Sequence, residues 1–378
     1  MVFLSGPRQV GKTTVGTDLG THYLNWDNSD HRLVILNGET AVAEMAGAHK
    51  ATAQRPILIL DELHHYSKWK LFLKGFFDLY SRDIQIVVTG SARLDIFKRG
   101  GDSLMGRYFP YRMHPLSVGE LLRPKVPDTE FGASEPVSDE DWGTLVTYGG
   151  FPEPFSRANK AFSTRWQRLR FEQLVREDIR EDTRIRELGQ IEALAQILAQ
   201  RSGDQIVYSS LANEIQVNEV TIRKWISTLN SLFFGFSVRP WSKHVANAIR
   251  KTPKWYLRDW STIEDIGKRN ETMVACHLLK AVELWTDIGM GNYDLYYIRD
   301  KQKREVDFLV VKDGIPWFLV EVKTGSTKLA PALGIMQQRV GAQHAFQVVF
   351  DLPYESVDSL QYKEPVVISA RTFLSQLP

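Results

Sequence analysis

The chain has 378 residues, of which 43% are hydrophobic and 24% are charged. This composition excludes a disordered chain and a coiled coil, and the length predicts two or three domains. Forty-seven Lys and Arg balance 45 Asp and Glu, so any affinity for nucleic acid requires a local basic patch. The single cysteine, Cys276, excludes an internal disulfide. We expect a cytoplasmic protein without a membrane segment, because the sequence shows no long apolar run and no export signal.

Short apolar runs in the first 120 or so residues predict the strands of a parallel sheet that is buried on both faces. These runs are Val2–Leu4, Leu33–Leu36, Ile57–Leu60 and Ile84–Val88. Polar stretches with helical character separate them, which is typical of an α/β fold with helices on both faces of the sheet. We assign residues 1–122 to this domain.

The next segment changes character. Residues 123–141 combine prolines with many acidic residues, which predicts a solvated loop at a domain boundary. From Phe162 to Gln200 apolar residues recur at helical spacing among dense charge. We therefore interpret residues 123–200 as an acidic loop followed by a helical connector.

Two short helices are predicted within residues 201–240. Ser209 and Asn218 are candidate N-caps, and residues 216–218 form the turn between the helices. This pattern predicts a helix-turn-helix or winged helix. Residues 241–378 return to mixed character, with expected strands at 294–298, 306–311 and 317–323 and a helix near 330–340, so we expect a second α/β domain there.

A phosphate-binding loop follows the first strand. The sequence Gly-Pro-Arg-Gln-Val-Gly-Lys-Thr fits the pattern G-x-x-x-x-G-K-[ST] between a strand and a helix. Backbone N–H groups and the start of the helix would surround the phosphates, while the lysine contacts them and the threonine hydroxyl reaches Mg²⁺. The residues expected to hold ATP are Gly6, Pro7, Arg8, Gln9, Val10, Gly11, Lys12, Thr13 and Thr14.

Two later strands supply the remaining polar groups of an ATPase site. Asp61 and Glu62 end an apolar strand, where Asp61 can hold Mg²⁺ and Glu62 can orient the attacking water. Thr89 ends another strand and is a candidate sensor of the γ-phosphate, with Ser91 as the alternative. We interpret His64 and His65 as ordinary loop residues, because no third ligand follows at zinc spacing.

These motifs together resemble the prokaryotic AAA+ ATPases that are fused to a C-terminal domain of nuclease-like fold. The resemblance rests on Gly6–Thr14, Leu60–Glu62, Thr89–Ala92, Met105–Arg107, Pro115–Ser117 and Gly149–Glu153. By the resemblance, Arg107 is an arginine finger that acts on the nucleotide of a neighbouring subunit, which implies a homo-oligomer. From the residues alone, Arg107 is equally a surface charge, and Arg93 or Arg99 could serve instead. Members usually carry a helical segment before the first strand, and five residues precede Gly6 here, so the adenine pocket stays unassigned.

Basic residues in the middle of the chain are candidate contacts to DNA. Arg223 and Lys224 lie on the outer side of the second predicted helix. Further basic residues follow among tryptophan and tyrosine, a composition suited to phosphate contact with aromatic stacking. These are Lys243, Arg250, Lys251 and Lys254. A packing module with a solvated basic face is the alternative.

Acidic residues and a lysine in the last domain resemble the site of PD-(D/E)xK nucleases. Asp307 lies in one expected strand, and Glu321 and Lys323 share a face of the next. Glu271, on the preceding helix, matches a further acidic position of that fold. The resemblance implies a second Mg²⁺ or Mn²⁺ site, with Lys323 positioning the attacking water.

The sequence thus predicts an ATP- and Mg²⁺-binding ATPase domain that is coupled to a nuclease-like domain engaging DNA. Two other functions stay open. In one, the nuclease-like domain is catalytically inactive and binds DNA or a protein partner under nucleotide control. In the other, the C-terminal half of an ATPase serves as an assembly scaffold.

Overall fold

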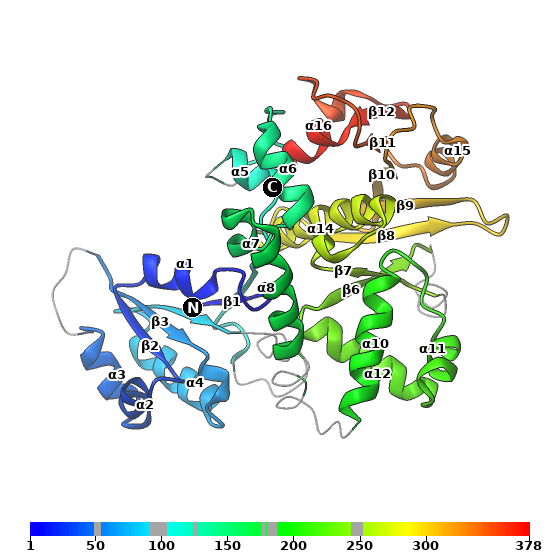
Figure 1. The fold of residues 1–378 in the computed structure, drawn as a ribbon. Coiled ribbons are helices and arrows are strands. Elements are labelled where there is room, and N and C mark those ends of the chain that lie inside the picture. Colours follow the sequence, from blue (N-terminus) through cyan, green and yellow to red (C-terminus); the bar gives the residue numbers. More distant parts are fainter. Residues whose placement is uncertain are drawn as a thin grey trace. The chain divides into compact units, whose positions relative to one another are not determined.

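The computed structural model describes residues 1–48, 54–90, 104–123, 125, 128–174, 179, 187–242 and 252–378. The chain divides into two compact units, Met1–His114 and Pro115–Pro378, and each unit contains its own β-sheet (Figure 1). Within the described ranges, no helix has both the length and the apolar character needed to span a bilayer.

The sheet of the first unit is entirely parallel, as the sequence predicts. Its strand order is β2-β3-β4-β1-β5. The strands are β1 (Val2–Ser5), β2 (His22–Asn25), β3 (Ile57–Asp61), β4 (Gln85–Thr89) and β5 (Phe109–Arg112). Because β4 lies between β1 and β3, the segments that follow these three strands meet at one edge of the sheet.

Helices cover this sheet and complete the first core. They are α1 (Lys12–Leu19), α2 (Ser29–Leu36), α3 (Glu39–Met45) and α4 (Trp69–Tyr80), with a 3₁₀ turn at Leu63–His65. The buried faces of α4 and of the central strands bring Phe72 and Phe76 into one cluster with Leu58 and Val88. This cluster fixes the strand ends that carry the polar groups.

The prediction of a strand at residues 33–36 is wrong, because this run forms the end of helix α2. The side chain of Asn28 accepts hydrogen bonds from the backbone N–H groups of Asp30 and His31 and so begins the helix. Leu33 and Leu36 are more than half exposed, whereas a central strand would have buried them. The strand of this sheet that was not predicted in its place is β2, in which only Leu24 is fully buried.

The second unit begins with helices. They are α5 (Val118–Leu122), α6 (Asp139–Tyr148), α7 (Pro152–Arg157), α8 (Lys160–Gln173), α10 (Leu188–Gln200), α11 (Tyr208–Ile215) and α12 (Glu219–Ser231). Asn218 caps α12 as expected, through its side chain and the Thr221 N–H. Ser209 is not a cap, because α11 begins at Tyr208 and Ser209 lies inside it. The antiparallel strands β6 (Gly235–Pro240) and β7 (Lys254–Leu257) follow, which gives the element order of a winged helix.

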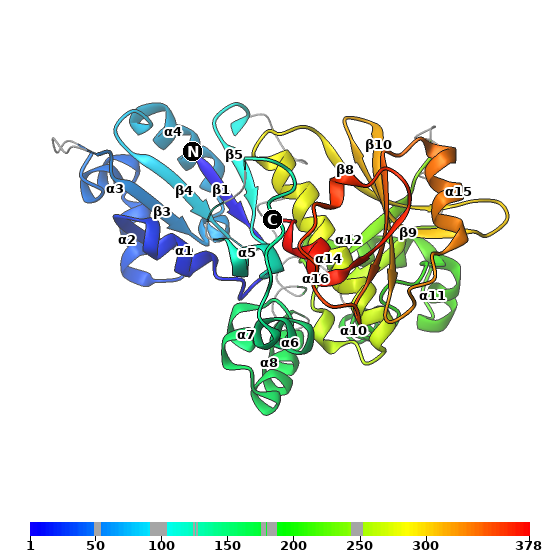
Figure 2. The same cartoon turned by 90° about the horizontal axis from the view of Figure 1, so that it is seen from above.

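A mixed sheet of seven strands forms the centre of the second unit, in the order β12-β11-β10-β9-β8-β6-β7. The further strands are β8 (Tyr293–Arg299), β9 (Glu305–Lys312), β10 (Ile315–Lys323), β11 (His344–Val349) and β12 (Val366–Ser369). Helix α14 (Ile266–Asp287) packs on one face with Phe308 and Val310, and α15 (Pro331–Val340) on the other with Leu309 and Val311 (Figure 2). The chain ends in α16 (Ala370–Ser375).

The described residues 128–141 of the acidic segment are not simply a solvated loop. Its last residues, Asp139–Asp141, form the first turn of α6 after the N-cap Ser138. Phe131 is buried against Trp285 and Trp317. This part of the chain therefore contributes to the core of the second unit.

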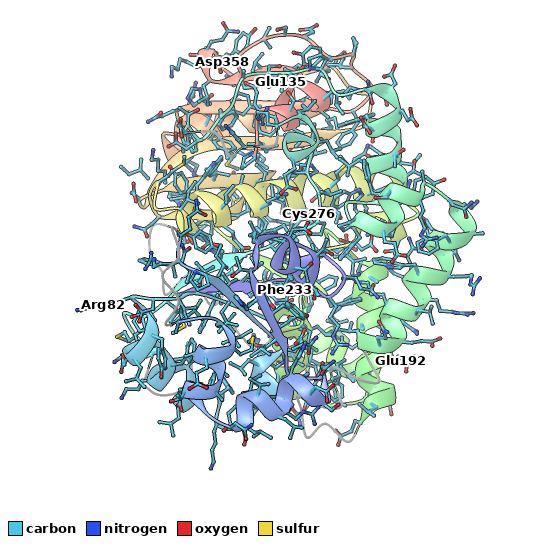
Figure 3. All side chains as sticks on the ribbon, turned by 90° about the vertical axis from the view of Figure 1, so that its left-hand side faces the viewer. Arg82, Glu135, Glu192, Phe233, Cys276 and Asp358 are labelled. Carbon is cyan, nitrogen blue, oxygen red and sulfur yellow. The ribbon has the colours of Figure 1, made fainter. Side chains whose placement is uncertain are left out.

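The lone cysteine is a packing residue. Cys276 is labelled on α14 in Figure 3 and is partly buried there. Its Sγ lies 3.5 Å from the Leu257 carbonyl oxygen, and burial raises the pKa of the thiol. A thiol with a raised pKa is a poor nucleophile, so the structure indicates no catalytic role for it.

Candidate functional site

The predicted phosphate loop connects β1 to α1 at the carboxyl edge of the first sheet. Gly11 has φ +101°, a left-handed conformation that favours glycine, and a Cβ atom on Gly6 would lie 2.3 Å from the Met113 carbonyl oxygen. Lys12 is the first residue of α1, and its Nζ donates to the Gly6 and Pro7 carbonyl oxygens at 2.9 and 2.6 Å. The loop thus surrounds an ammonium group for which a phosphate would be the anionic partner.

Asp61 is the centre of a cluster of hydroxyl groups. Its Oδ2 accepts from Thr13 Oγ1 at 2.9 Å and from the Tyr23 hydroxyl at 2.6 Å, and its Oδ1 accepts from Thr89 Oγ1. Asp61 and Thr89 are almost fully buried. Burial and the Asp61 carboxylate raise the pKa of Tyr23, so Tyr23 remains a hydrogen-bond donor at neutral pH. The strand order therefore brings together Thr13, Asp61 and Thr89, as the sequence predicts.

The Thr13 and Asp61 oxygens fit a shared Mg²⁺ ion. Mg²⁺ binds oxygen octahedrally at about 2.0–2.1 Å, so adjacent ligands lie about 2.9 Å apart. Thr13 Oγ1 and Asp61 Oδ2 lie 2.9 Å apart, joined by a hydrogen bond that an ion bound directly by both would replace. Both residues would hold the ion directly or through its water molecules, and the ion would neutralise charge on the phosphates.

Glu62 follows Asp61 and differs from it in environment. Its backbone adopts φ +52°, in the left-handed region, and its N–H donates to the Thr89 carbonyl oxygen at 3.1 Å. Burial and the neighbouring Asp61 carboxylate raise the pKa of Glu62, while Lys12 lowers it. A carboxylate of raised basicity beside a phosphate loop can accept a hydrogen bond from an attacking water.

Arg107 lies at the opposite edge of the same sheet. The N-terminal amine of Met1 donates to the Arg107 carbonyl oxygen at 3.0 Å, which places Arg107 beside the amino end of β1. Its Nε and Nη2 donate to the two carboxylate oxygens of Asp78 at 2.8 and 3.2 Å. Arg107 therefore cannot reach the phosphate loop of its own chain. The alternatives Arg93 and Arg99 lie outside the described residues.

The acidic residues of the second unit lie around a lysine that was predicted to contact DNA. Lys254 Nζ lies 2.9 Å from Glu305 Oε1, 3.1 Å from Glu271 Oε1 and 3.3 Å from Asp307 Oδ1. Lys254 is only 4% exposed, so the prediction of a phosphate contact is wrong for this residue. The carboxylates raise its pKa despite its burial, which keeps it charged.

The residues of the nuclease-like pattern lie close to this lysine. Lys323 Nζ donates to Glu321 Oε1 at 2.7 Å, and Asp307 Oδ2 accepts from the Val322 N–H at 3.0 Å. Glu321 Oε2 is buried without a hydrogen-bond partner among the described residues. Burial and the charge on Asp307 raise the pKa of Glu271 to about 7 and that of Glu321 to about 6.

These carboxylates do not fit a divalent cation in their present arrangement. A metal cage needs ligand atoms that converge, and over the parts of the chain that the structure describes, only Glu62, His64 and His65 bring three ligand atoms within 4.8 Å of one another. Glu271, Asp307 and Glu321 do not. Lys254 instead contacts Glu271 and Asp307 where a metal would have to lie.

Arg223 and Lys224 are both exposed on α12, as predicted. Arg223 lies 3.8 Å above the ring of Tyr208 and pairs with Glu219. It also lines a groove of about 950 Å³ with Tyr208, Arg239, Trp241 and Tyr296. Lys243, Arg250 and Lys251 lie outside the described residues.

Sequence reasoning missed Tyr23 and the pairing partners of Lys254. Tyr23 stands in a strand that carries little apolar signal, and it reaches Asp61 because β2 pairs with β3. Lys254 begins β7, and Glu305 begins β9, far along the chain. No local pattern connects such residues.

Comparisons with known proteins agree with the nucleotide site. Residues 1–122 match the family model described as an AAA domain, which confirms the ATPase-like nature of this region. Residues 139–268 and 266–352 match two families described as domains of unknown function, DUF8612 and DUF4143. These two matches do not identify a nuclease.

Proteins of low sequence identity align with most of the chain. An uncharacterized protein of Mycobacterium tuberculosis is 22% identical over an alignment of 339 positions, which covers 86% of this chain and 71% of that protein. An uncharacterized protein of Methanocaldococcus jannaschii is 21% identical over an alignment of 390 positions, which covers 89% of this chain and 78% of that protein. The Aeropyrum pernix ORC1 protein, solved in complex with DNA, shares 12% identity over 72% of this chain and 86% of its own, with a TM-score of 0.31. That similarity is too low to establish a common fold.

Proposed function

We propose that the first unit binds ATP with Mg²⁺ and hydrolyses it. The observation that carries this proposal is the meeting of Lys12, Thr13, Asp61 and Thr89 at one edge of the sheet, with Glu62 beside them. Lys12 binds the β- and γ-phosphates, and Thr13 with Asp61 holds the ion. Glu62 orients the attacking water, and Thr89 keeps Asp61 in place while it senses the γ-phosphate.

Two substitutions test the hydrolysis step. Lys12→Ala should abolish ATP binding, because it removes the only ammonium in the phosphate loop. Glu62→Gln should still bind ATP but turn it over at least about 100-fold more slowly, in the range for a lost general base. Lys68→Ala, at an exposed lysine before α4, is the matched control. Undiminished hydrolysis by Lys12→Ala would refute the assignment.

Arg107 acts in trans, on nucleotide held by a second copy of the chain. The support is its place at the edge opposite its own phosphate loop. A mixture of Arg107→Ala and Glu62→Gln chains should then recover activity that each lacks alone, because one pairing joins an intact Glu62 to an intact Arg107. No recovery in a mixed oligomer would contradict this role.

The second unit binds its partner without cutting it. The support is Lys254, whose ammonium already offsets negative charge on the carboxylates of the nuclease-like pattern. Under this proposal ATP binding or hydrolysis controls the partner-binding state of this unit. Incubation of the intact protein with DNA and Mg²⁺ or Mn²⁺, with and without ATP, should yield no nicking. Nicking that disappears with Asp307→Ala would overturn the proposal in favour of a nuclease.

Nucleic acid is the partner that the groove beside α12 favours. Arg223 and Arg239 supply positive charge, and Tyr208 and Tyr296 supply rings on which bases can stack. The affinity of the full chain for a fluorescent oligonucleotide should fall steeply with salt, and Arg223→Ala with Arg239→Ala should lower the salt slope. An unchanged slope would remove the groove from the interface.

A further inference from the structure

The short turn after β3 brings Glu62 together with two histidines that have no role in the proposed ATP hydrolysis. Glu62, His64 and His65 each place one ligand atom within 4.8 Å of the other two. His64 is buried, and the three residues lie within or directly before one 3₁₀ turn, Leu63–His65. A carboxylate with two imidazoles is a donor set that Zn²⁺ accepts, with solvent as the fourth ligand.

The spacing within this cluster suits a tetrahedral ion. Zn²⁺ binds histidine nitrogen and carboxylate oxygen at about 2.0–2.1 Å, so two ligands of a tetrahedral site lie about 3.3–3.4 Å apart. His64 Nδ1 and Glu62 Oε2 are 3.3 Å apart. This pair therefore already has the separation that one tetrahedral ion requires.

The third ligand, His65, has the support that metal-binding histidines usually have. His65 Nδ1 lies 3.1 Å from Asp27 Oδ1. A carboxylate on one ring nitrogen fixes the tautomer whose other nitrogen carries the lone pair for the metal. Asp27 comes from the segment after β2, so it orients His65 from outside the turn.

We propose that Glu62, His64 and His65 bind a transition-metal cation of the Zn²⁺ type, with Asp27 orienting His65, and that the bound ion inhibits the ATPase by engaging Glu62. The binding part stands on the cluster alone. The inhibitory part rests on the proposed role of Glu62 as the group that orients water, because a carboxylate bound to Zn²⁺ no longer accepts that hydrogen bond.

Metal binding is measured first, without nucleotide. Co²⁺ is the probe, since its visible absorption reports tetrahedral coordination, and Zn²⁺ should displace it from the full chain. His64→Gln and His65→Gln should each weaken binding at least tenfold, and Asp27→Asn about tenfold. His22→Gln, at the amino end of β2, is the matched control and should bind like the wild type. No tetrahedral signal, or equal affinity in all variants, would overturn the proposal.

Inhibition is measured separately. Zn²⁺ should inhibit hydrolysis at constant MgATP, a chelator should restore it, and His64→Gln should resist inhibition relative to its own metal-free rate. Co²⁺ binding that depends on His64 without any inhibition would overturn the inhibitory part and leave the site standing. If the chain does not hydrolyse ATP, the Co²⁺ binding result still stands. Failure of the metal site and failure of the proposed ATPase function can therefore be told apart.

Discussion

Replacement of Lys254 by methionine removes one charge from the second unit and keeps a chain of similar length. The ammonium lies within 3.3 Å of three carboxylates and is 4% exposed, so Lys254→Met leaves Glu271, Glu305 and Asp307 facing one another without a cation. Removing one partner of a buried ion pair costs about 3–5 kcal/mol of the free energy of unfolding. Protonation of Glu271, whose pKa is already raised to about 7, relieves part of this cost at low pH, so the loss should be larger at pH 8 than at pH 6.

Urea unfolding followed by tryptophan fluorescence measures this change, since all tryptophans except Trp26 and Trp69 lie in the second unit. Lys268→Met is the matched control, because Lys268 pairs with Asp204 at the surface and its loss should cost less than about 1 kcal/mol. Mn²⁺ should stabilise Lys254→Met and leave the wild type unchanged. A Lys254→Met protein as stable as the control variant, or a wild type that Mn²⁺ stabilises equally, would refute the reasoning.

Three further substitutions test separate parts of the structure. Glu321→Gln should have the same free energy of unfolding as the wild type near pH 4.5 and be about 2 kcal/mol more stable at pH 8. Burial raises the Glu321 pKa to about 6, so the wild-type native state loses stability as pH rises through that value. A pH-independent difference in urea unfolding would contradict this. Tyr23→Phe removes one hydroxyl from Asp61 and should change the Mg²⁺ concentration needed for half-maximal hydrolysis, while ATP binding without Mg²⁺ stays the same. Asn218→Ala should cost about 1 kcal/mol through loss of the α12 cap, and an unchanged urea midpoint would show that the cap is unimportant.

The strands predicted from sequence alone each contain at least three consecutive apolar residues. The runs at β3, β4, β9 and β10 are central and buried on both faces, so their composition reports their position. Strand β11 was not predicted, although it is fully buried. Its run is interrupted by Gln347, whose amide donates to the Ser326 and Lys328 carbonyl oxygens and whose oxygen accepts from Ala330 N. A satisfied polar side chain in a buried strand gives no sequence signal.

The two candidate sites also differ in how far the sequence could predict them. The phosphate loop is a continuous segment whose function depends on local backbone geometry, so its motif could locate Lys12 and Thr13 at the start of a helix that follows the first strand. The network in the second unit depends on where distant strands pair. The spacing of Asp307, Glu321 and Lys323 could not show that Lys254 would occupy the space between the carboxylates.

The Lys254 ammonium opposes the binding of a divalent ion among these carboxylates. A divalent ion 4 Å from the Lys254 ammonium would be repelled by about 2 kcal/mol in a water-like medium and about 8 kcal/mol at an effective dielectric constant of 20. Each 1.4 kcal/mol weakens binding tenfold, so even the smaller value lowers affinity more than tenfold. When ionised, the carboxylates carry four negative charges, from Glu271, Glu305, Asp307 and Glu321. The positive charges of Lys254 and Lys323 offset two of them. The acidic residues of the nuclease-like pattern are therefore better matched to holding β7 against α14 and β9 than to holding an ion for hydrolysis.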